Sequence, residues 1–404
     1  MLTKVSLIFL SSAIKFFSMI IILAPHLLYP LRNGGDIYIE RIGCHLSAHR
    51  APVFILGANT LTCYEMGAKT SQSHFLNNLR TKPWAAIRTL AFNSHYLIEK
   101  FLTNAYRQKA RELVLEYPEA VIIYSCISTA SLELTKDPAI VITQNDEVAF
   151  YRNLQVHTKN PLQKSVAAQS EKWVLNFLRH SKNNYIYAHI SETDQEAYSN
   201  YVLQHKSILV PAGVEPRSSF PLVNSQDKKI HLLFCGSLSA QMNLDALLFF
   251  KEKIWGLLKN YFQEAVDVWV AGSHPTSSVI NLCKSQGWAL YPDISDEDLN
   301  SLYEQATFGI LPFEYSAGAK IKLLNSLAAG LPVLATTSVK NIPEQDFLPN
   351  LFSNDPQKWL EHLQKYRITK YDISGRIVCQ QFAMQYSWQK IAEKMDSDLK
   401  SMGI

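Results

Sequence analysis

The chain has 404 residues, more than a single hydrophobic core usually organises, so its length indicates two or three domains. Hydrophobic residues make up 47% of the chain and charged residues 18%, a composition that excludes an intrinsically disordered protein. The formal net charge is only +4, whereas nucleic-acid-binding domains concentrate far more positive charge. We therefore expect no nucleic-acid partner, although the small basic excess suits an anionic small ligand or a membrane surface.

Residues 1–18 resemble part of a targeting signal. Lys4 precedes an apolar run, but Lys15 interrupts the hydrophobic stretch that follows. No segment therefore reaches the roughly 18 uncharged residues that a membrane-spanning helix needs. We expect a short leading segment that either precedes the first buried strand or contacts a membrane surface.

The next part of the chain alternates short apolar runs with amphipathic stretches, the pattern of a parallel sheet covered by helices. The predicted strands are residues 19–24, 51–57, 120–125, 139–143, 185–190 and 207–210. One long helix is predicted over residues 95–117, and another begins after Ser191, which has Asp194 three residues on as in a capping box. We interpret residues 19–210 as an N-terminal domain.

A stretch without periodicity, residues 211–229, contains three prolines and predicts an interdomain linker. After it the alternation resumes, with strands predicted at residues 230–236, 265–272, 288–291, 308–312 and 332–336. We assign residues 230–385 to a C-terminal domain and residues 386–404 to a final helix that can pack back on the N-terminal domain. The predicted architecture is two doubly wound α/β domains with a cleft between them.

The six cysteines include no C-x-x-C pair, and several lie in apolar runs. We therefore expect buried thiols of a reducing compartment, with no disulfide framework and no metal site. A cytoplasmic location is the corresponding expectation.

Small residues follow several of the predicted strands. Ligands of open parallel sheets bind beyond the carboxyl ends of the strands, where helix N-termini attract anions. Such positions carry Gly34-Gly35, Gly236-Ser237, Gly272-Ser273 and the stretch 316–318. Four such places across two domains indicate a ligand site, because small residues let a ligand approach the backbone.

The stretch 314–337 adds positive charge to this geometry. Gly318 lies near the start of its predicted helix, with Lys320 and Lys322 just inside. Lysines there oppose the helix dipole, a small cost that an anion would offset through charge-assisted hydrogen bonds of about 1.5–3 kcal/mol each. Lys322 and Asn325 share a helix face and could reach one ligand. The alternative is that both lysines are solvated surface residues.

The C-terminal half resembles the family 4 retaining glycosyltransferases, which have the GT-B fold. The resemblance rests on the order and spacing of residues 232–250, 268–273, 296–337 and 382–395. The N-terminal half is more distant, but residues 33–49 resemble the family's glycine-glycine loop and following helix, and residues 142–154 resemble its HNVE segment. The resemblance implies a GT-B fold of two Rossmann-like domains facing a central cleft, and a glycosyltransferase activity.

The resemblance also implies a set of residues that bind a nucleotide-diphosphate sugar. These are Gly35, Gly236, Ser237, Tyr291, Ile294, Gly318, Lys320, Lys322 and Asn325. Among them, Gly236 and Ser237 match the loop facing the diphosphate, and Lys322 is its expected partner. Asn325 stands where the family has the glutamate that holds the ribose hydroxyls, and Tyr291 and Ile294 bound the segment that meets the nucleobase.

The catalytic candidates are Glu147, which matches the glutamate of HNVE, and Asp36, each as a group that positions the acceptor hydroxyl. In this family retention is generally explained by front-side attack, which needs little from a protein nucleophile. No cofactor and no metal requirement are implied. The expected partners are the nucleotide-sugar donor and a glycan or lipid-linked acceptor of surface polysaccharide or glycoconjugate synthesis, at the inner face of a membrane.

Three departures from the family keep other readings open. The family's frequent Arg and Lys are missing from residues 237–243, where Asn243 remains from the Pro-Asn pair of a related subgroup. Asn325 replaces the ribose glutamate and lacks its charge, and Gln144 replaces the histidine of HNVE and cannot act as acid or base. The chain could instead be a non-catalytic homologue that supports a partner transferase. A non-hydrolysing nucleotide-sugar epimerase is the other alternative, with His189 and His274 at strand ends as its candidate acid and base.

Overall fold

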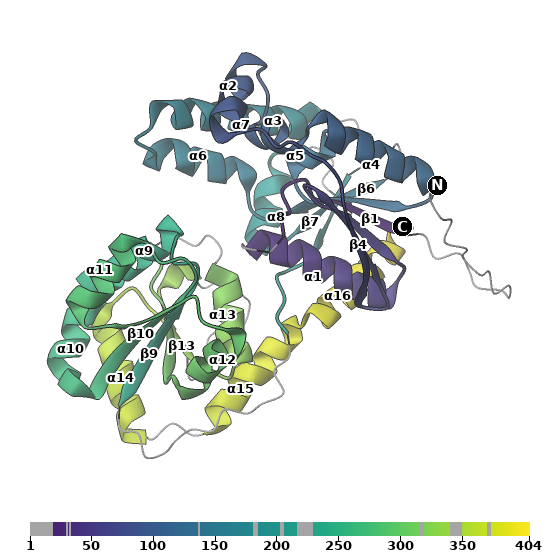
Figure 1. Ribbon diagram of the computed structural model, residues 1–404. Coiled ribbons are helices and arrows are strands. Elements are labelled where there is room, and N and C mark those ends of the chain that lie inside the picture. Colours follow the sequence, from purple (N-terminus) through teal and green to yellow (C-terminus); the bar gives the residue numbers. More distant parts are fainter. Residues whose placement is uncertain are drawn as a thin grey trace. The chain divides into compact units, whose positions relative to one another are not determined.

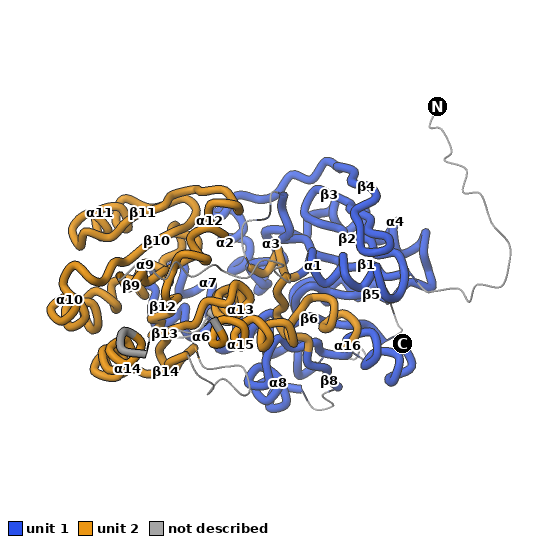
Figure 2. The backbone as a smooth tube through the Cα atoms, turned by 90° about the horizontal axis from the view of Figure 1, so that it is seen from below, with its two compact units in different colours: residues 1–31, 39–209, 395–404 blue, residues 32–38, 210–394 orange. Residues whose placement is uncertain are grey.

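The computed structural model describes residues 19–29, 31, 34–135, 138–180, 185–202, 206–215, 229–314, 319–339, 350–369 and 373–404. The chain divides into two compact units (Figure 2). Unit 1 comprises residues 1–31, 39–209 and 395–404, and unit 2 comprises residues 32–38 and 210–394. The leading segment 1–18 and most of the expected linker lie outside the described residues. Within the described part of the chain, no helix is both long enough and apolar enough to span a membrane.

Unit 1 is built on an eight-stranded sheet in the order β4-β3-β2-β1-β5-β6-β7-β8 (Figure 1). Its strands are β1 (Ile20–Leu23), β2 (Val53–Leu56), β3 (Thr60–Glu65), β4 (Ala68–His74), β5 (Val121–Tyr124), β6 (Ala139–Thr143), β7 (Tyr185–His189) and β8 (Lys206–Leu209). All pairings outside the β2-β3-β4 edge are parallel. The central strands β1, β6 and β7 are buried along their whole length, as expected of parallel strands covered on both faces.

The helices of unit 1 connect these strands. They are α1 (Gly34–His49), whose first turn belongs to unit 2, α2 (Lys82–Ala91), α3 (Tyr96–Phe101), α4 (Asn104–Glu116), α5 (Ile127–Ala130), α6 (Glu147–His157), α7 (Pro161–His180) and α8 (Glu192–Ser199). The predicted cap of α8 is present, since the Ser191 hydroxyl accepts a hydrogen bond from the Asp194 backbone at 3.2 Å.

Two features of unit 1 differ from the sequence prediction. β3 and β4 form an antiparallel hairpin that was not predicted, because β4 is exposed throughout and its sequence, AKTSQSH, has no apolar run. The predicted helix 95–117 is in fact two helices, α3 and α4. Thr103 interrupts it by taking an extended conformation and accepting a hydrogen bond from the Tyr106 backbone at 3.2 Å, which makes it the N-cap of α4.

Unit 2 contains a six-stranded parallel sheet in the order β11-β10-β9-β12-β13-β14 (Figure 1). Its strands are β9 (Ile230–Cys235), β10 (Val266–Gly272), β11 (Ala289–Pro292), β12 (Phe308–Leu311), β13 (Val333–Ala335) and β14 (Leu351–Phe352). The sequence runs from β9 to β10 and β11 on one side, then returns to β12, β13 and β14 on the other. This reversal is the doubly wound arrangement that the alternating pattern predicts.

The helices of unit 2 are mostly those that the sequence predicts. They are α9 (Gln241–Phe249), the π-helical η1 (Phe250–Trp255), α10 (Gly256–Phe262), α11 (Ser277–Gln286), α12 (Asp296–Gln305), α13 (Ala319–Ala328), α14 (Pro356–Thr369), α15 (Ile373–Ala383) and α16 (Trp388–Ser401), with short 3₁₀ segments η2 (Gln263–Ala265), η3 (Thr337–Val339) and η4 (Met384–Tyr386). α16 contributes its residues from Met395 onward to unit 1.

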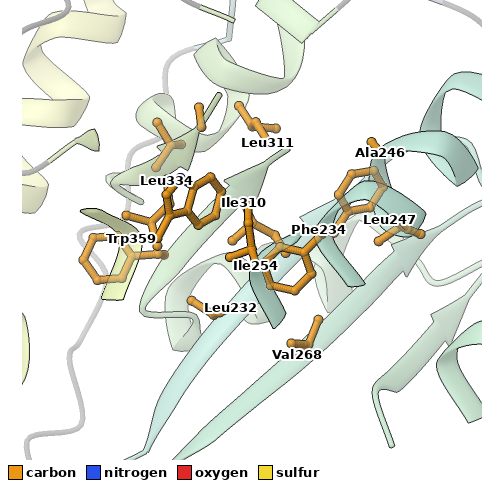
Figure 3. Packing of buried hydrophobic residues seen from close by; sticks show 14 of the residues in the cluster. Leu232, Phe234, Ala246, Leu247, Ile254, Val268, Ile310, Leu311, Leu334 and Trp359 are labelled. Carbon is orange, nitrogen blue, oxygen red and sulfur yellow. The ribbon is translucent and has the colours of Figure 1, made fainter. Parts of the chain in front are cut away.

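The core of unit 2 forms where strand and helix side chains meet (Figure 3). Phe234 from β9 and Ile310 from β12 are fully buried there beside Ile254 from η1. Trp359 from α14 is also fully buried, and its indole N–H donates to the Ser353 carbonyl at 2.8 Å, so the one polar atom of that ring is satisfied.

The last turns of α16 are held within unit 1 by charge. Asp396 lies 3.3 Å from the Arg50 guanidinium, and both side chains are almost fully buried. Lys400, one turn on, approaches the same carboxylate at 2.5 Å. Removing one partner of a buried ion pair is costly because the other charge is left without compensation.

We therefore expect Asp396→Ala to lower the free energy of unfolding by about 3 kcal/mol, measured by urea denaturation followed by circular dichroism. Ser397→Ala, at an exposed position of the same helix, is the matched control and should change little. Equal stabilities of the two variants would contradict a structural role for the pair.

Candidate functional site

Two strand ends of unit 2 lie in direct backbone contact. The Gly236 amide, after β9, donates to the Ala271 carbonyl at 3.1 Å, and the Leu238 amide donates to Ser273 at 2.8 Å. Gly272 has a φ of +156°, and a Cβ there would lie 1.7 Å from the Gly236 carbonyl oxygen. No other residue fits at position 272, because that oxygen already occupies the space.

Lys322 of α13 lies against the first of these loops. A Cβ on Gly236 would come within 2.8 Å of Lys322 Cε, so the missing side chain of Gly236 makes room for the lysine. The Lys322 ammonium lies 5.3 Å from the centre of the Phe313 ring, in the segment after β12. Gly236, Phe313 and Lys322 thus bring together the ends of two strands and the start of a helix.

The position of Lys322 gives this place its electrostatic character. Its side chain is largely withdrawn from water, and burial lowers the pKa of its ammonium, an effect that nearby Cys235 partly opposes. Among the described residues, no carboxylate lies within ion-pair distance of Lys322. A partly buried ammonium at a helix N-terminus favours an anionic ligand.

Asn243 supports the same loop and was not among the predicted site residues. Its side-chain amide donates to the Ser237 carbonyl at 2.7 Å, and this nitrogen would lie 3.0 Å from a Cβ on Gly236. In the described part of the chain, its buried Oδ1 has no hydrogen-bond partner. The sequence signal was present, since Asn243 remains from a motif of related proteins, but no ligand contact followed from it alone.

The other predicted donor-side residues are placed as follows. Asn325 lies one turn beyond Lys322 on α13 and is half-buried. Tyr291 packs edge-on against Trp269 at 6.1 Å between ring centres, and Ile294 joins the same small cluster. Ser237 places its hydroxyl 3.0 Å from that of Ser239.

The structure places three further predicted residues only in part. Gly318 lies outside the described residues, and so does the side chain of Lys320, whose backbone is in the first turn of α13. Gly35 is in the first turn of α1, a segment that packs within unit 2. There a Cβ on its neighbour Gly34 would lie 3.0 Å from Ile321 Cδ1, between the two predicted lysines in the sequence.

Unit 1 holds Glu147 at the carboxyl end of its sheet. Asp146 caps α6 by accepting hydrogen bonds from the backbone of Val148 and Ala149, which fixes Glu147 as the first residue of the helix. The Ile127 amide donates to Glu147 Oε1 at 3.2 Å. Oε2 is buried and, within the described part of the chain, has no hydrogen-bond partner.

The environment of Glu147 keeps a proton on it. Burial raises the pKa of its carboxyl to about 8, and the Cys126 thiol adds to the rise, against smaller opposite effects of the Ile127 amide and His26. At neutral pH the side chain is therefore mostly a neutral acid that can both donate and accept a hydrogen bond.

Asp36 is buried in the first turn of α1, at 3% exposure. It belongs to unit 2, whereas Glu147 belongs to unit 1, so the two candidate catalytic residues are on different units.

The two candidate histidines differ in availability. His189 is fully buried, and its Nδ1 is 2.6 Å from the Thr143 hydroxyl, which gives it a structural hydrogen bond. His274 is exposed, with a φ of +52°, and its amide donates to Asp293 at 2.8 Å. Within the described residues, no group of three or more His, Cys, Asp and Glu side chains is arranged to hold a metal ion.

Comparison with known proteins extends this picture. Residues 229–366 match the model of the family described as "Glycosyl transferases group 1". No match was found among proteins of curated function. Among solved structures, WaaG, a glycosyltransferase involved in lipopolysaccharide biosynthesis, is similar with a TM-score of 0.59 and 13% identity, over 93% of this chain and 98% of that one.

Two further solved structures are similar to the same extent. Anabaena HepE in complex with UDP-glucose gives a TM-score of 0.58 at 11% identity, covering 95% of this chain and 99% of HepE. The α,α-trehalose 6-phosphate synthase of Burkholderia multivorans gives 0.57 at 11% identity, covering 96% and 99%. At these identities the likeness establishes the fold, so the predicted GT-B fold is confirmed.

The raised pKa of Glu147 makes a prediction for stability. An unfolded chain ionises this carboxyl near its ordinary value of 4.5, whereas the folded protein keeps the proton until about pH 8. The stability of the folded protein is therefore lowered as pH rises between these values, by up to about 1.4 kcal/mol per pH unit. Glu147→Gln lacks this dependence. The difference between its free energy of unfolding and that of the wild type should therefore shift in favour of the variant as pH rises from 5 to 8.

Urea denaturation at a series of pH values checks this expectation. Glu192→Gln is the matched control, because Glu192 follows the N-cap of α8 as Glu147 follows that of α6 but is exposed. If Glu147→Gln and wild type kept a constant difference over the range, the neutral state of Glu147 would be refuted.

Proposed function

We propose that this chain is a glycosyltransferase that moves a sugar from a nucleotide-diphosphate donor to a glycan or lipid-linked acceptor, in surface polysaccharide or glycoconjugate synthesis. The observation that carries the proposal is the partly buried ammonium of Lys322 against the Gly236 loop, in the segment that matches the group 1 glycosyl transferases. The neighbouring folds are consistent with it, since HepE was solved with UDP-glucose.

A cation at this site would stabilise the departing diphosphate. As the bond from the sugar to the diphosphate breaks, negative charge gathers on the leaving phosphate oxygen. Lys322 and the N-terminal amides of α13 would stabilise that charge. An ammonium already withdrawn from water needs little rearrangement when the charge develops, which makes its effect on the transition state larger.

We further propose that the transfer retains the configuration of the sugar. In front-side attack the acceptor oxygen bonds to the anomeric carbon on the face that the diphosphate leaves, and the acceptor proton passes to the departing phosphate oxygen. Glu147, neutral at physiological pH, would then hold the acceptor hydroxyl by hydrogen bonding and would not remove its proton. Asp36 is proposed as a second positioning group.

Asn325 motivates the alternative of a non-catalytic homologue. Its amide oxygen can accept a ribose hydroxyl hydrogen bond but supplies no charge, so it supports a weaker hold on the donor than a glutamate would. The epimerase alternative has less support, because the buried hydrogen bond of His189 to Thr143 removes one of its two candidate groups.

The first test is binding of nucleoside diphosphates. A ligand at 100 times its Kd stabilises the folded protein by about 2.7 kcal/mol, which a thermal melt detects. We expect at least one nucleoside diphosphate of a panel to raise the Tm of the wild type, and Lys322→Ala to remove that rise while remaining folded. Lys284→Ala, an exposed lysine of α11, should keep it. An unchanged rise in Lys322→Ala would rule out the assignment of this lysine.

The second test separates the enzyme from the binding protein. The nucleotide-sugar donor whose nucleoside diphosphate binds is incubated with the protein, and released nucleoside diphosphate is measured with and without candidate acceptors. Release by the wild type, lost in Lys322→Ala, supports the transferase. Tight binding without any turnover would instead identify the non-catalytic homologue, and interconversion of the sugar without release would identify an epimerase.

Gly236→Ala provides a further prediction. The added Cβ meets the flexible end of Lys322 at 2.8 Å and the Asn243 amide nitrogen at 3.0 Å, so both side chains must shift, and we expect the protein to stay folded with a modestly lowered Tm. Displacing the ammonium should weaken nucleoside diphosphate binding by about tenfold or more, equivalent to one charge-assisted hydrogen bond. Gly256→Ala is the control, since a Cβ there meets nothing within 4 Å. Wild-type affinity in Gly236→Ala would show that the close packing of Gly236 and Lys322 is irrelevant to the ligand.

A further inference from the structure

Asn243 of α9 is a buried amide with only part of its hydrogen bonding satisfied. It is 2% exposed, and its Nδ2 donates to the Ser237 carbonyl at 2.7 Å. Within the described residues, its Oδ1 is buried and has no hydrogen-bond partner. A buried acceptor without a donor costs free energy, so such an atom calls for an explanation beyond the support of the loop.

The nearest donor of positive charge is Lys322. A Cβ on Gly236 would lie 3.0 Å from Asn243 Nδ2 and 2.8 Å from Lys322 Cε, so both side chains border the space that this glycine leaves open. The bond from Nδ2 to Ser237 fixes the plane of the amide, and Oδ1 is directed away from the Ser237 carbonyl. The unsatisfied oxygen and the lysine therefore belong to one small region of unit 2.

The Lys322 ammonium has a second position open to it. In this structure it lies 5.3 Å from the centre of the Phe313 ring, a contact that involves no directed hydrogen bond. The backbone of the lysine is anchored, since the Ser326 hydroxyl donates to the Lys322 carbonyl at 3.0 Å. Because a lysine side chain is a flexible four-carbon stem, its ammonium can turn away from the ring without any movement of α13.

The chemistry of a diphosphate decides what Asn243 Oδ1 can bind. Ionised phosphate oxygens only accept hydrogen bonds, and so does an amide oxygen, so a direct contact between them would be repulsive. A lysine ammonium has three N–H donors. It can therefore donate to phosphate oxygens and to Asn243 Oδ1 at the same time, which satisfies the buried oxygen and fixes the direction of the charge.

We propose that Asn243 is a positioning residue for Lys322: when a nucleoside diphosphate binds, the ammonium leaves the Phe313 ring and donates one hydrogen bond to Asn243 Oδ1 and the others to the diphosphate. The inference rests on the proposed function and deepens it by naming the group that orients the lysine. Burial lowers the pKa of the Lys322 ammonium, and an acceptor beside it favours the charged form that an anion needs. A water molecule on Oδ1 is the competing explanation, and it would leave Lys322 independent of position 243.

NMR of the full chain with ¹⁵N-labelled lysine tests the proposal. The diphosphates of uridine, guanosine, adenosine, cytidine and thymidine are screened by thermal melts, and one that raises the Tm of the wild type is used throughout. Lysine ammonium protons exchange rapidly with water unless they are held in hydrogen bonds. We therefore expect the saturated complex to show an ammonium signal for Lys322, assigned by its absence in Lys322→Arg, and none for the exposed Lys284.

Two substitutions of Asn243 separate its two polar atoms. Asn243→Ala should weaken nucleoside diphosphate binding by about tenfold and remove the Lys322 signal even at saturation. Asn243→Asp keeps an oxygen acceptor but loses the Nδ2 donor to Ser237, so it should retain the signal. Asn281→Ala, at an exposed position of α11, is the matched control and should behave like the wild type.

Gly236→Ala keeps the test independent of how well the Asn243 variants fold. Its methyl group would stand between Asn243 and Lys322 and should also remove the signal. An unchanged signal in Asn243→Ala would overturn the proposal, and so would equal loss in Asn243→Ala and Asn243→Asp, which would leave the bond to Ser237 as the whole role of Asn243. These results concern Asn243 alone, whereas a wild type that binds none of the diphosphates would refute the proposed function and this inference together.

Discussion

The shape of the candidate site in unit 2 depends on the absence of a side chain at both Gly236 and Gly272, beside Lys322. Gly272 and Gly236 allow the ends of β10 and β9 to touch through their backbones, and Gly236 leaves room for the Lys322 side chain. The lysine can then be withdrawn from water without an acidic partner among the described residues. The N-terminus of α13 opposes the positive charge of Lys322, which costs free energy. An anion bound beside the lysine would offset that cost, so the site favours an anionic ligand.

Unit 1 presents the opposite kind of group. Unit 2 holds the Lys322 ammonium, which has no carboxylate partner among the described residues. Unit 1 holds Glu147, whose carboxyl stays protonated because it is buried. A neutral acid can donate a hydrogen bond to an incoming hydroxyl without repelling a phosphate-rich ligand, as an ionised carboxylate would. The two units thus carry groups of different chemical character, an ammonium in unit 2 and a neutral carboxyl in unit 1.

The sequence predicted the parallel strands well, because buried strands such as β6 and β7 are unbroken apolar runs. It did not predict β4, whose polar residues carry no periodicity signal, nor the break at Thr103, where a local cap outweighs a continuous helical pattern. Lys322 could be selected from its position after a strand. Its contact with Gly236 and the role of Asn243 depend on backbone approach between distant segments, which no local pattern reports.

The exchange of segments between the units affects how the chain reaches its folded state during synthesis. Unit 1 includes residues 395–404, which the ribosome adds only after the whole of unit 2, and Asp396 must meet Arg50, made some 350 residues earlier. Until then, Arg50 lacks the Asp396 carboxylate with which it pairs in the folded protein. Unit 1 is therefore expected to gain its last packed segment late, after the whole of unit 2 has been synthesised.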